Sequence, residues 1–250
     1  MTPFQIVTVL AIAGEVISIH LHNHTGVYVA AIFFFVMMGC GVAIPRMRYF
    51  GPFICRGRGQ GKKVALTFDD GPDPRSTPKL LDILREAKIP AAFFCIGKHV
   101  AAHPELAARI VREGHLLENH TYNHSNFTNF YPVSRLRREM TDTQKAIEKS
   151  SHTVPEYFRP PMGLSHPGVF RAAKLQGMQV VGWTIRSLDT IIRKPAKIVA
   201  RIRCRLHHGA IILLHDGNIP VEKMEATVKS LLDTLNQTGY EVVRLDKLLK

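Results

Sequence analysis

Two apolar stretches open the chain. Residues 4–19 are mostly apolar but contain Glu15, and residues 27–44 contain no charged side chain. The second stretch is long enough to cross a bilayer as a helix, whereas the first is marginal. Neither has the basic start and small-residue cleavage site of a secretory signal. The pattern therefore predicts a membrane anchor over 1–45, formed by one or two transmembrane helices and most simply by a helical hairpin.

From residue 64 onward, short apolar runs alternate with helical patterns. The runs predict seven strands, near 64–68, 91–95, 115–119, 156–159, 179–184, 210–214 and 240–243. Apolar residues at helical spacing predict helices over 77–87, 104–113, 133–149, 167–176, 195–206 and 220–236. This alternation is typical of parallel strands joined by crossover helices. It predicts an α/β domain over 64–250, but periodicity alone does not separate a barrel from an open sheet.

A basic linker, 46–63, joins the anchor to the domain. It contains no acid, and its basic residues are Arg46, Arg48, Arg56, Arg58, Lys62 and Lys63. Basic flanks of transmembrane helices stay in the cytoplasm. We therefore expect an integral membrane protein, of a bacterial inner membrane, with the domain on the cytoplasmic side. The loop at 20–24 has three histidines, for which a polar hairpin turn is a simpler interpretation than a metal site.

The net charge of +13 points to anionic partners. Nucleic acid, lipid headgroups and phosphorylated sugars are the candidates. The chain has no glycine-rich phosphate loop, zinc-finger spacing or aromatic RNA motif, so we expect no nucleic-acid partner. Its four cysteines form no CxxC pair, which favours buried free thiols over a disulfide framework. The sequence leaves the oligomeric state open.

Two adjacent carboxylates, Asp69 and Asp70, follow the strand predicted at 64–68. A Gly-Pro turn comes directly after them. Carboxylates this close repel each other unless their tasks differ, for example when one binds a metal and the other accepts a proton. An Asp-rich turn without chemistry is the alternative interpretation.

Two histidines, His120 and His124, follow the strand predicted at 115–119. A spacing of four residues places both imidazoles on one side of a helical turn. Two histidines with one carboxylate form a set that binds divalent metals and leaves positions open for water and substrate. Combined with the carboxylate pair, the histidines predict a metal site.

Four motifs together resemble those of the polysaccharide deacetylases of the NodB-homology type, carbohydrate esterase family 4. They occur in the order of that family, as TFDDGP at 67–72, HTYNH at 120–124, RPPMG at 159–163 and LLHD at 213–216. The similarity extends from about Lys63 to the C-terminus. It implies an irregular seven-stranded (β/α) barrel. It also implies a hydrolase of carbon–nitrogen bonds other than peptide bonds, which removes an N-acyl group, in most cases acetyl, from an amino sugar.

The resemblance also assigns roles to individual residues. It implies that Asp70, His120 and His124 bind a divalent metal, with Zn²⁺ expected. Such a metal lowers the pKa of bound water and polarises the amide carbonyl.

Four further residues resemble the family's acid–base machinery. Asp69 is the expected general base, and His215 is the expected general acid that protonates the leaving amine. Arg159 resembles the arginine that holds the base carboxylate ionised. Asp189 resembles the carboxylate that orients the acid histidine and supports its protonated form.

Some positions depart from the family pattern. Met162 and Thr190 stand where aromatic residues of the sugar groove are common, and Arg186 stands where an acid is common. A long chitin-like substrate is therefore doubtful. Trp183 has two interpretations, a core side chain in a strand, which we favour, and a platform for a sugar ring.

A basic stripe over 194–205 is formed by Lys194, Lys197, Arg201 and Arg205. A solvated helix face is the simple interpretation. Because the stripe belongs to a chain with a membrane anchor, a second interpretation is that it contacts anionic lipid headgroups.

These observations favour a membrane-anchored deacetylase of an N-acylated amino sugar in a glycolipid, lipid-linked sugar or cell-surface polysaccharide. A deacetylase of peptidoglycan or exported polysaccharide is the enzymatic alternative, and it requires the domain outside. A carbohydrate-binding membrane protein is the non-enzymatic alternative. Binding alone needs no acid, base and open metal site, which argues against it.

Overall fold

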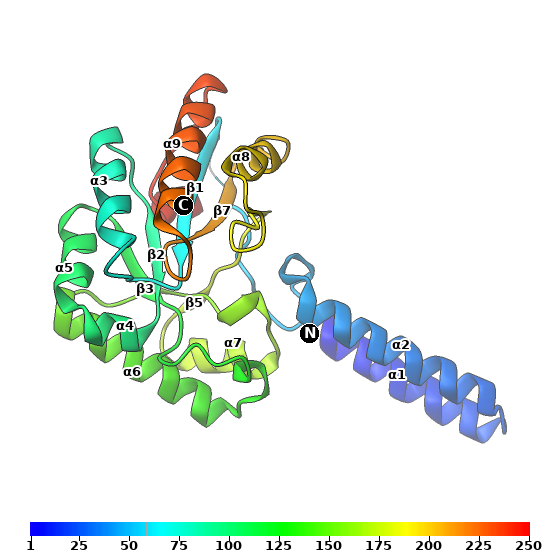
Figure 1. Cartoon of the computed structure of the whole chain (residues 1–250). Coiled ribbons are helices and arrows are strands. Elements are labelled where there is room, and N and C mark those ends of the chain that lie inside the picture. The colour runs from blue at the N-terminus through cyan, green and yellow to red at the C-terminus, as the bar shows by residue number, and fades with distance from the viewer. Residues whose placement is uncertain (59) are drawn as a thin grey trace.

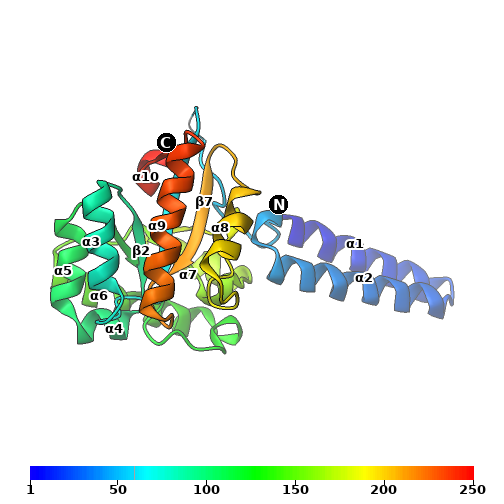
Figure 2. The same cartoon turned by 45° about the horizontal axis from the view of Figure 1, so that its top comes forward.

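A helical hairpin and an α/β domain make up the protein, and the computed structural model describes residues 1–58 and 60–250 (Figure 1). The hairpin consists of α1 (Pro3–His20) and α2 (His24–Ala43), which lie side by side and project from the domain (Figures 1 and 2). Their mean hydropathies, 1.5 and 2.2, and their lengths suffice to cross a membrane. Within these helices only Ala11 and Gly41 are buried. The apolar surface therefore faces outward, as it does in a membrane-spanning hairpin.

The base of the hairpin is packed onto the domain. After a short 3₁₀ turn (Pro45–Met47), the backbone oxygen of Tyr49 accepts a hydrogen bond from the Phe4 N–H at 3.0 Å. The Tyr49 ring lies so close to Gly41 that a Cβ there would be 2.1 Å from it. The rings of Phe4 and Phe50 pack with centroids 5.4 Å apart. Side-chain contacts therefore join the hairpin to the segment that follows it, and in that segment Arg46 Nη2 donates to the Thr184 carbonyl oxygen of the domain at 2.5 Å.

The domain is built on a curled sheet in which all strand pairs are parallel. The described residues form eight strands in the order β5-β4-β3-β2-β1-β7-β6, with β8 paired to β1. Their bounds are β1 (Lys63–Asp69), β2 (Ala92–Cys95), β3 (Leu116–Asn119), β4 (Tyr157–Phe158), β5 (Gln179–Val180), β6 (Ile185–Arg186), β7 (Ala210–His215) and β8 (Glu241–Val242). The predicted fold class is confirmed. The structure has one strand more than predicted: β5 covers only the start of the strand expected over 179–184, and β6 follows that range and was not predicted.

Residues 54–56 lie across the open side of the sheet. Ile54 forms a parallel bridge with Val181, just after β5, and Arg56 forms an antiparallel bridge with Ala210 of β7. Phe53, which is 1% exposed, packs edge-on against Phe170. Part of the 46–63 segment therefore contacts the domain directly.

Helices surround the curled sheet, and α8 lies on the side that faces the hairpin (Figures 1 and 2). The helices are α3 (Thr77–Ala87), α4 (Gly97–Ala102), α5 (Pro104–Arg112), α6 (Val133–Ser151), α7 (Pro167–Leu175), α8 (Pro195–Arg203), α9 (Val221–Gln237) and α10 (Leu245–Leu249). Six of them match predicted helices, whereas α4 and α10 were not predicted. Proline occupies one of the first two positions of α3, α5, α7 and α8, where its missing N–H costs nothing.

Both faces of the sheet are buried. On the outer face, Phe68 and Phe93 stack with centroids 5.4 Å apart beneath the helices. Inside the curl, the small side chains of Ala65 and Ala92 leave room for Leu248 of α10. Burying each large apolar side chain contributes about 1.5–3 kcal/mol. The core thus fixes the strands, and their carboxyl ends meet at one edge.

Candidate active site

The parallel pairing brings the predicted catalytic side chains to one edge of the sheet. Asp69 is the last residue of β1, His215 is the last residue of β7, and the two are register partners. β3 ends at Asn119, so His120 leaves the sheet at the same edge. Chemistry in parallel sheets is found at this edge because the carboxyl ends of the strands converge there.

Three side chains at this edge are spaced as a metal-binding group. Asp70 Oδ1 lies 3.6 Å from His120 Nε2 and 3.3 Å from His124 Nε2. The three ligand atoms lie within 4.8 Å of one another, and no other trio with this spacing occurs in the part of the chain that the structure describes. One carboxylate and two imidazoles suit a divalent ion.

Protonation at the trio also fits a cation. His120 Nδ1 lies 2.6 Å from the carbonyl oxygen of Arg159, which can only accept, so Nδ1 carries the proton of this bond and the ring is fixed with Nε2 toward Asp70. Burial lowers the pKa of His124, and the neighbouring His120 lowers it further, so the neutral form is favoured. Burial raises the pKa of Asp70, but the neighbouring His120 and His124 lower it to about 2. The trio therefore directs one carboxylate oxygen and two imidazole nitrogens toward a common point.

The turn that carries the two histidines is not helical, so the predicted helical turn is wrong. Thr121 and His124 have φ values of 65° and 51°, in the left-handed region. Asn119 Oδ1 accepts from the Thr121 N–H at 3.1 Å, and Thr121 Oγ1 accepts from the His124 N–H at 3.2 Å. These local side-chain hydrogen bonds replace those of a helix, and the resulting turn still directs both imidazoles to Asp70.

A buried carboxylate that the sequence analysis missed supports this turn. Glu139 of α6 is 6% exposed. Its Oε2 accepts from the backbone N–H groups of Tyr122 and Asn123, at 3.0 and 2.9 Å, and its Oε1 accepts from the Asn123 side-chain amide at 2.9 Å. The sequence contains a sign of this role, because Glu139 is an acidic residue on the same buried helix face as Leu136 and Met140. Glu139 is a positioning residue for the histidines.

Asp69 is held by a guanidinium that is itself fully buried. One terminal nitrogen of Arg159 donates to Asp69 Oδ1 at 2.6 Å and to Thr67 Oγ1 at 2.9 Å. The remaining guanidinium nitrogens donate to two backbone carbonyl oxygens. Asp69 Oδ2, by contrast, faces the metal-binding trio, 3.8 Å from His120 Nε2. One carboxylate oxygen is therefore anchored, and the other is free to react.

His215 is held by a second buried carboxylate. Its Nδ1 lies 2.8 Å from Asp189 Oδ1, and its backbone N–H donates to Asp189 Oδ2 at 2.8 Å. Burial lowers the pKa of His215, but the hydrogen bond and charge of Asp189 outweigh burial and raise it to about 9. Burial likewise raises the pKa of Asp189, but the hydrogen bonds and charge of His215, together with the hydrogen bond from Ser187, lower it overall. His215 is therefore an imidazolium whose Nε2–H remains available.

A pocket of about 180 Å³ opens over these side chains. Met162, Trp183, Arg186 and Thr190 complete its walls. Trp183 lies between β5 and β6, half-buried, and packs so close to Gly163 that a Cβ there would be 2.1 Å from the ring. The favoured prediction is therefore wrong about the strand, although Trp183 does pack against the inner core. Its place on the pocket wall also fits the alternative, a platform for a sugar ring.

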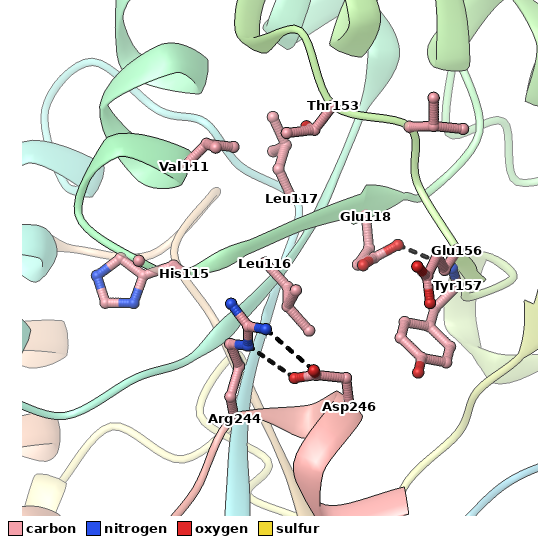
Figure 3. Close-up of a pocket in the computed structure, with 12 residues that line it drawn as sticks. Val111, His115, Leu116, Leu117, Glu118, Thr153, Glu156, Tyr157, Arg244 and Asp246 are labelled. Carbon is pink, nitrogen blue, oxygen red and sulfur yellow. Dashed lines mark hydrogen bonds and ion pairs between the residues drawn. The ribbon is translucent and has the colours of Figure 1, made fainter.

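A second cavity, of about 260 Å³, lies at the amino-terminal end of the strands (Figure 3). Arg244 and Asp246 form an ion pair there at 2.7 Å, and Glu118 Oε2 accepts from the Tyr157 N–H at 2.8 Å. Burial raises the pKa of Glu118 to about 8. Among the described residues, no metal-binding trio lies here. The groups suited to hydrolysis are thus at the opposite end.

The structure brings all seven predicted site residues together: Asp69, Asp70, His120, His124, Arg159, Asp189 and His215. The arrangement offers a metal-binding trio, a carboxylate with one free oxygen and a protonated imidazole. Amide hydrolysis requires activation of water, removal of one proton and delivery of another. The edge of the sheet has a residue type suited to each of these steps.

Comparison with known proteins agrees with this chemistry. The family model described as polysaccharide deacetylase matches residues 56–181. A peptidoglycan-N-acetylglucosamine deacetylase of Bacillus cereus is 37% identical over 191 residues, which cover 76% of this chain and 89% of that protein.

Solved structures show the same fold. A family 4 acetyl xylan esterase from Clostridium thermocellum, solved with a cobalt ion, has a TM-score of 0.69 and 32% identity, covering 75% of this chain and 90% of that one. A family 4 pseudoenzyme from Bacillus anthracis has a TM-score of 0.71 and 27% identity, and the match covers 80% of this chain and 69% of that one. Because a pseudoenzyme shares the fold, activity has to be argued from the residues of the site.

Proposed function

The chain belongs to the polysaccharide deacetylase family, and from this premise we propose a membrane-anchored, metal-dependent hydrolase that removes an N-acetyl group from an amino sugar. One observation carries the proposal. The metal-binding trio, the Asp69–Arg159 pair and the His215–Asp189 pair converge on a single pocket. A protein that only binds carbohydrate needs no such combination of acid, base and metal donors.

The proposed metal ligands are Asp70, His120 and His124, and the mixed nitrogen and oxygen donors favour Zn²⁺. When bound, such an ion lowers the pKa of water and polarises the amide carbonyl. The chain itself orients the donors, since the Arg159 carbonyl fixes the ring of His120 and Glu139 fixes the turn.

Asp69 is the proposed general base. Its Oδ2 faces the trio and takes the proton of the attacking water, while Arg159 holds Oδ1 and prevents the carboxylate from turning away. A base positioned in this way contributes about 10²–10⁴-fold to the rate.

His215 is the proposed general acid. Its Nε2–H donates to the nitrogen of the leaving amine, so that the carbon–nitrogen bond breaks without an amide anion as leaving group. Asp189 stabilises the imidazolium before the proton is transferred. Because Nδ1–H donates to Asp189, the proton for the substrate comes from Nε2. The general acid and the general base are thus held by different residues, Asp189 and Arg159.

The proposed substrate is a lipid-linked sugar or glycolipid precursor. The small pocket and the side chains of Met162 and Thr190 on its wall favour a short substrate over a polymer. The apolar hairpin supports membrane attachment, and the basic residues of 46–63 support a cytoplasmic domain. We further propose the division into an anchor at 1–45, a linker at 46–63 and a catalytic domain at 64–250.

Peptidoglycan or an exported polysaccharide remains the alternative, and the name of the Bacillus cereus relative favours it. The experiment is a substrate screen with full-length, metal-loaded protein in detergent. N-acetylglucosamine on a polyprenyl diphosphate, chitotetraose and peptidoglycan fragments are compared by release of free amine. Release from the lipid-linked sugar supports the proposal, and release from the glycans alone selects the alternative. Glycan binding without release from any substrate identifies a binding protein.

A further inference from the structure

Arg186 points into the catalytic pocket. It is the last residue of β6, and it is exposed, whereas Ile185 before it is 1% exposed within the outer core. Successive side chains of a strand point to opposite faces. Arg186 therefore faces the mouth of the curled sheet, beside its register partner Leu213, which lines the same pocket.

The two carboxylates that line this pocket already have partners. Asp69 is paired with Arg159 at 2.6 Å, and Asp70 faces the two histidines. Across residues 1–58 and 60–250, no carboxylate forms an ion pair with Arg186. A guanidinium has five donors and no acceptor. The donors of Arg186 are thus available to a ligand in the pocket.

Positive charge continues from Arg186 onto α8. Arg201 Nε donates to the backbone oxygen of Arg186 at 3.0 Å, which places this member of the basic stripe of 194–205 next to a residue of the pocket wall. Lys194, Lys197 and Arg205 of this stripe are exposed. Charge of a single sign around a cleft raises the local concentration of ligands of opposite sign. The mouth of the site thus favours an anionic group.

The size of the pocket limits the kind of molecule to which the anionic group is attached. Its volume of about 180 Å³ is below the range of about 300–1,000 Å³ that is usual for drug-sized ligands. A single sugar unit fits this space better than a polymer, and its recognition depends on groups attached directly to it.

We infer that Arg186 is a specificity-determining residue that binds a phosphate-type group attached to the N-acylated sugar, an inference that rests on the proposed deacetylase function. The planar guanidinium matches two phosphate oxygens at once, and such charge-assisted pairs are stronger than neutral hydrogen bonds. A free sugar phosphate and a lipid-linked sugar share this chemistry. Arg186 thus selects either of them over a neutral glycan.

The test uses metal-loaded, full-length protein carrying Arg186→Ala or Arg186→Lys. Arg112→Ala is the matched control, because Arg112 is an exposed arginine at the end of α5, away from the pocket lining. The probes are N-acetylglucosamine 1-phosphate, its polyprenyl diphosphate counterpart and neutral N,N′-diacetylchitobiose. Binding is measured by calorimetry, and turnover by amine release.

Arg186→Ala should weaken binding and lower kcat/KM about 10- to 100-fold for the phosphate-bearing probes. Chitobiose should be unaffected, Arg186→Lys should retain part of the selectivity, and Arg112→Ala should match the unmodified protein. A dependence confined to the polyprenyl probe assigns the phosphate to a lipid carrier.

Equal losses on all probes, or unchanged phosphate binding in Arg186→Ala, would overturn the inference. Unchanged binding is also the result expected when the metal alone holds the phosphate. If binding depends on Arg186 but no probe releases amine, the deacetylase function fails while the assignment of Arg186 stands.

Discussion

His215 Nδ1 lies 2.8 Å from Asp189 Oδ1, although 26 residues separate the two in the chain. The same carboxylate accepts from Ser187 Oγ at 2.8 Å and from the backbone N–H of His215. Because Asp189 is buried and fixed by these donors, its charge acts strongly on the imidazole. The pair explains why His215 has a pKa near 9 despite burial, which by itself lowers it.

Replacing Asp189 by asparagine should move the alkaline limb of the pH–rate profile to lower pH. With Asp189 present, His215 stays protonated up to about pH 9 and serves as an acid across the neutral range. Without that charge its pKa falls toward the ordinary value of about 6.5, a shift of up to about 2.5 units. Rates of Asp189→Asn and of the control Asp246→Asn, measured from pH 5.5 to 10, test this. An unchanged alkaline limb in Asp189→Asn would exclude His215 as the acid.

Glu139→Gln should weaken metal binding although Glu139 is no ligand. The carboxylate accepts three hydrogen bonds from the histidine turn, and the glutamine amide nitrogen cannot accept any of them. Residues that support ligands typically contribute about 10–100-fold to metal affinity. Chelator competition on Glu139→Gln gives the affinity, and Glu148→Gln on the same helix is the control. Equal affinities in the two variants would show that the turn does not need this support.

Glu118→Gln should stabilise the protein at pH 8 more than at pH 5. Burial raises the pKa of Glu118 to about 8 in the folded protein, whereas the unfolded chain loses that proton near pH 4.3. Between these values unfolding releases a proton, so stability falls as pH rises. The glutamine avoids this loss and still accepts from the Tyr157 N–H. Thermal unfolding at both pH values tests this, and a difference independent of pH would contradict it.

The parallel fold and the pairing of two carboxylates with two histidines followed from sequence patterns, and the full set of seven site residues followed from the family resemblance. Apolar runs ending in Asp69 and in His215 indicated strand ends, and parallel pairing then required these ends to meet at one edge. Burial on both faces makes such strands continuous apolar runs, so they are easy to recognise.

Other features depend on contacts that a sequence pattern does not contain. The turn from His120 to His124 has helical spacing, but its hydrogen bonds come from Asn119 and from Glu139 on α6. The run at 179–184 forms a strand only at Gln179–Val180, and the carbonyl oxygens of Val181 and Gly182 accept from the buried Arg159. Glu139 and Arg159 are far in sequence from the groups that they bind, and only the folded chain brings them together.

The side of the membrane on which the domain lies is tested by fusing reporter proteins after Lys250. The basic residues of 46–63 predict that the domain stays in the cytoplasm. A fluorescent reporter that matures in the cytoplasm should therefore be bright, and an alkaline phosphatase fusion, which requires export, should be inactive. Matched fusions in which Arg46 and Arg48 are replaced by glutamate test whether this charge sets the orientation. The opposite pair of reporter results would place the site outside and favour a cell-wall substrate.

The central claim is that Asp70 binds the metal and Asp69 removes the proton. Metal content and rate of amine release, measured together on Asp69→Asn and Asp70→Asn, test it most directly. Asp69→Asn should retain the metal and lose about 10²–10⁴-fold in rate. Asp70→Asn should lose the metal, as should His120→Ala and His124→Ala. Loss of metal from Asp69→Asn, or an unchanged rate in a metal-loaded Asp69→Asn, would contradict the account.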